Sequence, residues 1–128
     1  MLARQDARGF TLIELLIVVV IIGLLVAIAI PKFTTTKEKA YLAAMKTDLR
    51  NLATAQEAYL YDNNQYTSSF PASVYTVSAG VANLVITLQT AGWQATIGHN
   101  ITTKTCAIFV NAPAIAPATS EGVPGCTQ

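Results

Sequence analysis

Hydrophobic residues form one long, almost unbroken run near the start of the chain. Between positions 10 and 30 the polar residues are Thr11 and Glu14, and Gly23 lies in the middle of the run. About 21 residues in a helix, at roughly 1.5 Å each, span about 31 Å, which is the thickness of the hydrocarbon core of a bilayer. The pattern therefore predicts a helix that needs lipid, or other helices, around its whole circumference.

After Pro31 the pattern changes to that of an amphipathic helix. Apolar side chains recur at helical spacing, with Gln56 as an interruption: Leu42, Met45, Leu49, Leu52 and Tyr59. The charged residues, Asp48 among them, are expected largely on other faces. The run Asp62-Asn63-Asn64 favours turns and caps, and should end the helix. We predict one helix over residues 10–61, apolar all round in its first half and covering a sheet with its second half.

The rest of the chain predicts a loop, a small sheet and an irregular tail. Serine, proline and glycine mark residues 65–80 as a loop. Alternating residues at 84–89, 93–99 and 105–111 predict strands, and the turns at 90–92 and 100–104 favour an antiparallel meander. The expected inward side chains are Leu84, Ile86, Leu88, Trp93, Ala95, Ile97, Cys106, Ile108 and Val110. The fold class is α+β, with about three to four antiparallel strands packed on the second half of the helix.

Composition adds two constraints. The chain has 128 residues and a formal net charge of +1, a balance that does not indicate a nucleic-acid-binding surface. The part after the apolar run is short enough that its core is marginal without a staple or an assembly. Cys106 and Cys126, in a chain with a membrane segment, suggest an oxidising compartment and one disulfide. The alternative is two buried free thiols.

Residues for catalysis or metal binding are scarce. His99 lies at the end of a predicted strand without a second histidine or a CxxC pair, so we interpret it as solvated. Phosphate loops, nucleophile elbows and paired carboxylates are not recognisable in the sequence. We therefore expect no enzymatic activity, no catalytic residues, no metal site and no cofactor.

The N-terminus has two ordinary interpretations. In a secretory signal peptide, the basic start would precede an apolar region and a cleavage site at Ala27-Ile28-Ala29. The apolar run is long for that role, and Glu14 places a charge inside it. In a signal anchor, Arg4 and Arg8 would remain on the cytoplasmic side of the membrane.

A third interpretation accounts for more of the residues. Residues 8–14 read RGFTLIE and lead directly into the apolar run, which resembles the N-terminus of type IV pilin precursors. The resemblance implies cleavage between Gly9 and Phe10 by a prepilin peptidase, and N-methylation of Phe10 by the same enzyme. Gly9 has no Cβ to obstruct the peptidase. Glu14 would attract the terminal amine of a neighbouring subunit, whereas in the alternative it snorkels to the lipid headgroups.

The resemblance also implies a domain organisation. Residues 1–9 would be a cleaved leader, residues 10–31 a transmembrane and assembly helix, and residues 32–128 a globular pilin domain. In the family the helix can lose helicity between positions like Gly23 and Pro31, and we expect a gentle kink at Pro31. A disulfide from Cys126 to the third strand would resemble the disulfide-bounded C-terminal region of pilins.

The function implied is that of a structural subunit of a type IV pilus. Its partners would be further copies in a helical homopolymer, the prepilin peptidase, the inner-membrane assembly machinery and the membrane itself. The precursor would reside in the inner membrane and the filament outside the cell, for adhesion, twitching motility or DNA uptake. The closest alternative is the major pseudopilin of a type II secretion system, whose members usually lack this disulfide and carry a calcium site. A minor pilin, or an anchored domain that never polymerises, are the further alternatives.

Overall fold

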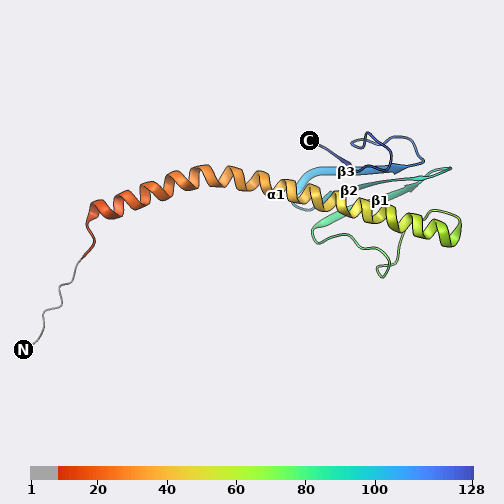
Figure 1. The fold of residues 1–128 in the computed structure, drawn as a ribbon, viewed down its shortest axis with the longest axis horizontal. Helices are drawn as coiled ribbons and strands as arrows, with labels where there is room; N and C mark the ends of the chain where they lie inside the picture. The colour runs from red at the N-terminus through yellow and green to blue at the C-terminus, as the bar shows by residue number, and fades with distance from the viewer. Residues whose placement is uncertain (1–8) are drawn as a thin grey trace, which may run out of the picture. The chain divides into compact units, whose positions relative to one another are not determined.

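A computed structural model describes residues 9–128, so residues 1–8 of the expected leader lie outside it. The helix α1 covers Leu12–Asn63, and four strands follow it (Figure 1). They are β1 (Val81–Leu88), β2 (Trp93–His99), β3 (Thr102–Val110) and β4 (Gly125–Cys126). The predicted α+β class is confirmed.

The chain forms two compact units that divide at Thr36, and α1 runs through both. In the first unit, α1 continues past Pro31 without interruption. The hydroxyls of Thr34 and Thr35 donate to the Pro31 carbonyl, each over 2.9 Å, and Thr36 donates to Lys32 over the same distance. The threonine hydroxyls therefore find acceptors within their own helix, which suits a solvent that offers few other acceptors. A kink at Pro31 stays a prediction.

In the second unit, Lys37–Gln128, the strands form one antiparallel sheet in the order β1-β2-β3-β4. β1 and β3 each begin three residues earlier than the sequence pattern predicts. The turn expected over residues 100–104 is shorter, because Thr102 already pairs with His99. Threonine is favoured in strands, and this preference extends the strand where the apolar alternation does not. The register of β1 shifts between Ala82 and Val85, where Asn83 has a positive φ of 56°.

The core lies between the second half of α1 and one face of the sheet. The most deeply buried side chains are Met45, Leu49, Leu52, Trp93, Ala95, Ile97, Cys106 and Ile108. Burying a large apolar side chain contributes about 1.5–3 kcal/mol, so this contact holds the helix on the sheet. Leu88 departs from the prediction: it is 44% exposed, because it ends the strand beyond the edge of the core.

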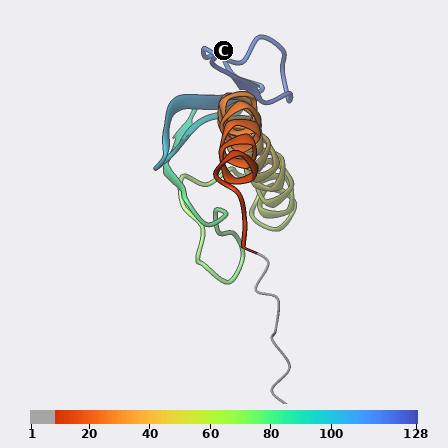
Figure 2. The same ribbon diagram turned by 90° about the vertical axis from the view of Figure 1, so that its left-hand side faces the viewer.

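The C-terminal tail covers the other face of the sheet. Side chains alternate along β3, so Ala107 and Phe109 point away from α1. They pack with Ala118 and Ile115 of the tail, which runs beside β3 (Figure 2). The approach is close at Gly125, where a Cβ would lie 2.5 Å from the Pro117 carbonyl oxygen. The tail therefore covers the outer face of the sheet at β3, whereas Val85 of β1 stays exposed, and the sequence pattern alone did not predict this cover.

Three polar side chains lie deeper than their sequence positions indicate. Asp48 is 2% exposed, because its carboxylate accepts hydrogen bonds from the Ser78 N–H and hydroxyl, each over 2.8 Å. Gln56 does not interrupt the buried face. Its amide donates to the Thr67 carbonyl over 2.6 Å and accepts from the Thr67 N–H over 3.1 Å. Both residues attach the loop after α1 to the helix.

His99 is also buried, at 8% exposure, so the prediction of a solvated histidine is wrong. Its ring stacks on Tyr41 at 4.3 Å, and its Nδ1 accepts the N–H of Ile101 over 3.2 Å. The stack closes the end of the core where α1 enters the second unit.

Candidate functional site

The predicted processing site is open on every side. Gly9 and Phe10 precede α1, and a Cβ built on Gly9 would meet no atom within 4 Å. Phe10 is 91% exposed. Crowding within the chain therefore does not require glycine at position 9.

Glu14 caps the helix that contains it. The Thr11 N–H donates to Glu14 Oε2 over 2.8 Å and the Thr11 hydroxyl donates to the same oxygen over 2.9 Å. The Glu14 N–H donates in turn to Thr11 Oγ1 over 3.3 Å. This is a capping box, in which threonine and a glutamate three positions later satisfy each other's backbone groups. The carboxylate thus has a partner in its own chain before any neighbour arrives.

The capping role was readable from the sequence and was missed. A threonine followed three residues later by glutamate, before an apolar run, is its signature. The same glutamate also has the assembly role that the resemblance implies. The two roles are compatible, since a carboxylate has more acceptor sites than the box uses.

The apolar segment has no cover within its own unit. Every large hydrophobic side chain between positions 10 and 30 is exposed, from 45% at Val26 to 91% at Phe10. Among the described residues, α1 is the one helix with a stretch long and apolar enough to span a bilayer. Such a surface is far larger than a soluble monomer exposes, and indicates a lipid or protein environment.

Gly23 and Pro31 both lie inside the continuous α1. The space around the Gly23 Cα is open, with nothing within 4 Å of a built Cβ. Packing inside the chain therefore does not demand glycine here. Loss of helicity between these two positions stays a prediction about an assembled state.

The two cysteines form the predicted disulfide. Cys106 of β3 and Cys126 of β4 stand opposite each other in the sheet register, with Cα atoms 4.0 Å apart. The adjacent Thr127 N–H donates to the Thr105 carbonyl over 2.9 Å. The bond therefore attaches the end of the tail to the sheet, and the alternative of two free thiols is wrong.

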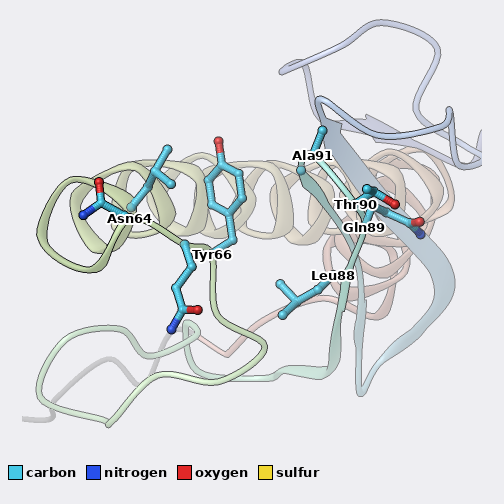
Figure 3. Close-up of a pocket in the computed structure, with 9 residues that line it drawn as sticks. Asn64, Tyr66, Leu88, Gln89, Thr90 and Ala91 are labelled. Carbon is cyan, nitrogen blue, oxygen red and sulfur yellow. The ribbon is translucent and has the colours of Figure 1, made fainter.

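The described residues include no cluster of three or more His, Cys, Asp or Glu side chains suited to a metal ion. A hollow of about 300 Å³ lies between the end of α1 and the β1–β2 turn. Tyr66 and Leu88 line it, whereas the side chains of Gln89 and Thr90 point away from Tyr66 (Figure 3). Burial, and next the charge of Glu57, raise the pKa of Tyr66, whose hydroxyl donates to Glu57 over 3.2 Å. The lining mixes apolar and polar side chains.

The N-terminal region is similar to known proteins. A family profile described as a prokaryotic N-terminal methylation motif matches residues 4–30. The type IV major pilin protein PilA of Myxococcus xanthus is 49% identical over 59 residues, which are 46% of this chain and 27% of that protein. The N-terminal half of the chain is therefore similar to type IV pilins.

Two further relatives belong to different systems. The type IV wide pilus major component PilA4 of Thermus thermophilus is 43% identical over 65 residues, 51% of this chain and 50% of that protein. The type II secretion system core protein G of Pseudomonas aeruginosa is 38% identical over 66 residues, 52% and 46% of the two chains. The pilin-like chain thus spans between about a quarter and a half of the length of these relatives. No solved structure matches it.

Proposed function

We propose that this chain is the precursor of a filament subunit. It would be stored in the inner membrane and polymerised through its N-terminal helix into a type IV pilus. The observation that carries the proposal is the uncovered apolar segment of α1, which follows a methylation motif and is exposed along its whole length. Lipid would cover this segment in the precursor, and neighbouring helices would cover it in the fibre. The relatives are structural proteins, which supports a role without enzymatic turnover.

Processing would generate the assembly-competent form. A prepilin peptidase would remove residues 1–9 and methylate the new amine of Phe10, leaving residues 10–31 as the membrane and assembly segment and 32–128 as the surface domain. The exposed Gly9–Phe10 link, with open space around Gly9, supports access of such an enzyme.

Assembly would use both roles of Glu14. In the free subunit its Oε2 is shared with Thr11. In the fibre its remaining acceptor capacity would meet the Phe10 ammonium of a neighbour, in a water-poor bundle where an unpaired ammonium is costly. The correct axial stagger between subunits is the one that brings these two groups together.

The assembled filament would act outside the cell in adhesion, twitching motility or DNA uptake. Contact with surfaces or DNA would fall to the second unit, because the apolar segment would be enclosed. Gly23 and Pro31 would give the enclosed helix a segment that can unwind as subunits pack.

A second candidate is the major pseudopilin of a type II secretion system. The similarity to core protein G favours it. The Cys106–Cys126 disulfide favours the pilus, because pseudopilins of that kind usually lack it. An anchored domain that never polymerises is the third candidate, and it would leave the Gly9-Phe10 motif without a purpose.

The deciding experiment is mass and N-terminal analysis of fibres sheared from cells that produce the chain. We expect a subunit that starts at N-methylated Phe10 and is two hydrogens lighter than the reduced chain. A chain that starts at Met1, or at Ile30, would overturn the proposal. Fibres that appear only when a type II secretion system is overproduced would favour the second candidate.

Two variants separate the roles of Glu14. Glu14→Ala removes both the cap and the charge, and should leave leader removal intact while strongly lowering fibre yield. Thr11→Ala is the matched control, since it removes the capping hydroxyl and keeps the carboxylate, at a cost of about 1 kcal/mol in helix stability. Equal fibre loss in the two variants would show that the cap, and not the pairing, is what assembly needs.

A further inference from the structure

The basic and acidic residues of the second unit lie at opposite ends of its part of α1. The side where α1 enters, here called the entry end, contains Lys37, Lys39 and the β2–β3 turn. The turn is placed there by the Tyr41–His99 stack and by Thr102, whose hydroxyl lies 3.5 Å from Glu38. The opposite side, called the far end, contains Glu57, Asp62 and the β1–β2 turn. About 23 helical residues, or roughly 35 Å, separate Lys39 from Asp62.

The formal charges of this unit cancel, but their signs are separated. Within this unit, from Lys37 onward, four basic residues precede Glu57 along α1, at 37, 39, 46 and 50, and the other charged residues of this part of the helix are acidic. The two acidic exceptions are each satisfied internally: Glu38 lies 3.7 Å from Lys104, and Asp48 binds Ser78. Glu121 adds to the far end, because it accepts the N–H of Asn111, the residue after β3. The entry end is therefore basic and the far end acidic.

At the far end, the negative charge near the C-terminus of α1 is not balanced by a basic residue in the last turn of the helix. The last turn of α1 contains Asp62 and no basic residue. A helix C-terminus already carries a partial negative charge, so an acidic side chain there is destabilising and a cation is favoured. An external basic group would relieve this arrangement.

Shape complements the charge at the two ends. Ile101, at the tip of the β2–β3 turn, is 69% exposed. The far end carries the hollow of about 300 Å³, whose lining includes Leu60, Tyr66 and Leu88 (Figure 3). The hollow has a mixed lining, with Asn64, Gln65, Gln89 and Thr90 beside these apolar residues. An exposed apolar residue at one end and a partly apolar hollow at the other are the parts of a heterologous, head-to-tail contact, which repeats without closing.

We propose that the entry end of one copy docks on the far end of another copy further along the filament, with Ile101 seated in the hollow and Lys39 near Asp62 of that copy. The axial offset of roughly 35 Å makes it a different copy from the one whose Phe10 meets Glu14, about one helical turn away. The docking rests on the proposed function as a filament subunit, and adds to it a second contact formed by the surface domains. The occupant is another copy of this chain, since both complementary surfaces are present on every copy. The contact determines the relative orientation of the two docked domains, because only a head-to-tail arrangement brings their opposite charges together.

A charge-swap experiment on the full chain tests the docking. Lys39→Glu and Asp62→Lys each replace an attraction with a repulsion, and should weaken subunit association roughly fivefold or more, read as sheared fibre relative to membrane subunit. The double variant Lys39→Glu/Asp62→Lys should regain most of the yield. Arg50→Glu is the matched control, an exposed reversal in the middle of the helix, and should have a smaller effect than either single variant.

The outcomes separate this inference from the proposed function. Three results would each overturn the docking and leave the filament proposal intact. They are a wild-type fibre yield from either single variant, a double variant that yields no more fibre than the single variants, and an equal loss of yield in Arg50→Glu. A wild-type chain that forms no fibres would overturn both.

A second pair of variants tests the apolar part of the contact. Ile101→Ser should lower fibre yield without changing the unfolding midpoint of the subunit, since the side chain is exposed. Val85→Ser is the control, because Val85 is 56% exposed on the outer face of β1. Equal yields from the two variants would remove Ile101 from the contact.

Discussion

Residues 12–36 of α1 expose all of their large apolar side chains, whereas residues 42–56 bury a stripe of them under the sheet. The hydrogen-bonded backbone is the same in both halves. The difference is that the second half finds its partners in its own chain, while the first half does not. Helical stability in proteins comes mostly from packing of a face, so the two halves depend on different surroundings. The stability of the second unit should therefore depend on its own core. The stability of the first unit should depend on the lipid or the neighbouring helices around it.

The largest expected difference comes from shortening one apolar side chain in each half. Leu49→Ala should lower the free energy of unfolding of the second unit by about 2–5 kcal/mol, because Leu49 is fully buried and leaves a cavity. Ile21→Ala is the control, and should change the same quantity by less than about 0.5 kcal/mol. Urea unfolding of the full chain in detergent, followed by Trp93 fluorescence, measures both. Similar losses from the two variants would contradict the comparison.

Removing the disulfide should again affect the second unit alone. Cys106 and Cys126 are 20 residues apart, and opening a loop of this size costs about 3 kcal/mol in the chain-entropy model. Unfolding of the variant Cys106→Ala/Cys126→Ala, with and without reductant, measures the effect. Reductant should destabilise the wild type and leave the variant unchanged. A loss of helix content in the apolar segment on reduction would count against two independent units.

A smaller change in the free energy of unfolding is expected from the hydrogen bonds that attach the following loop to α1. Gln56→Ala leaves the Thr67 N–H and carbonyl without their partners, and should cost about 1–3 kcal/mol. Amide hydrogen exchange at Thr67 should accelerate in the same variant. Thr54→Ala is the matched control, because the Thr54 hydroxyl bonds only the Arg50 carbonyl of its own helix. Unchanged exchange at Thr67 would show that the loop is held by other contacts.

The smallest effect concerns alkaline pH. Burial, and next the charge of Asp48, raise the pKa of Tyr75 from its ordinary value near 10 to about 12. The folded state therefore keeps this proton more tightly than the unfolded state, so the contribution to stability is complete below pH 10 and is lost as pH rises towards 12. Denaturant unfolding across this range should show the decline in the wild type and a flatter profile in Tyr75→Phe. Tyr61→Phe, at an 88% exposed tyrosine, should retain the wild-type profile.

Much of the fold was predictable from local pattern. The long helix, its change of character after Pro31, its end near Asn63 and the central strand at residues 93–99 follow from neighbours in the sequence. Of the candidate site, the motif at residues 8–14 is readable directly from the sequence. The cap formed by Thr11 and Glu14 was also local, and went unnoticed although its signature is in the same motif.

The structure was needed wherever a residue's partner lies far along the chain. Sequence alone determined that the first half of α1 needs an apolar environment, because a run of apolar residues is unambiguous whatever surrounds it. It also suggested that Cys106 and Cys126 pair. Only the tertiary structure decided that Asp48 and Gln56 are buried, that His99 closes the core and that the tail covers the sheet. Burying a charged or amide side chain is costly without a hydrogen-bond partner, and the partners of Asp48 and Gln56 are 30 and 11 residues away, beyond the reach of any periodic pattern.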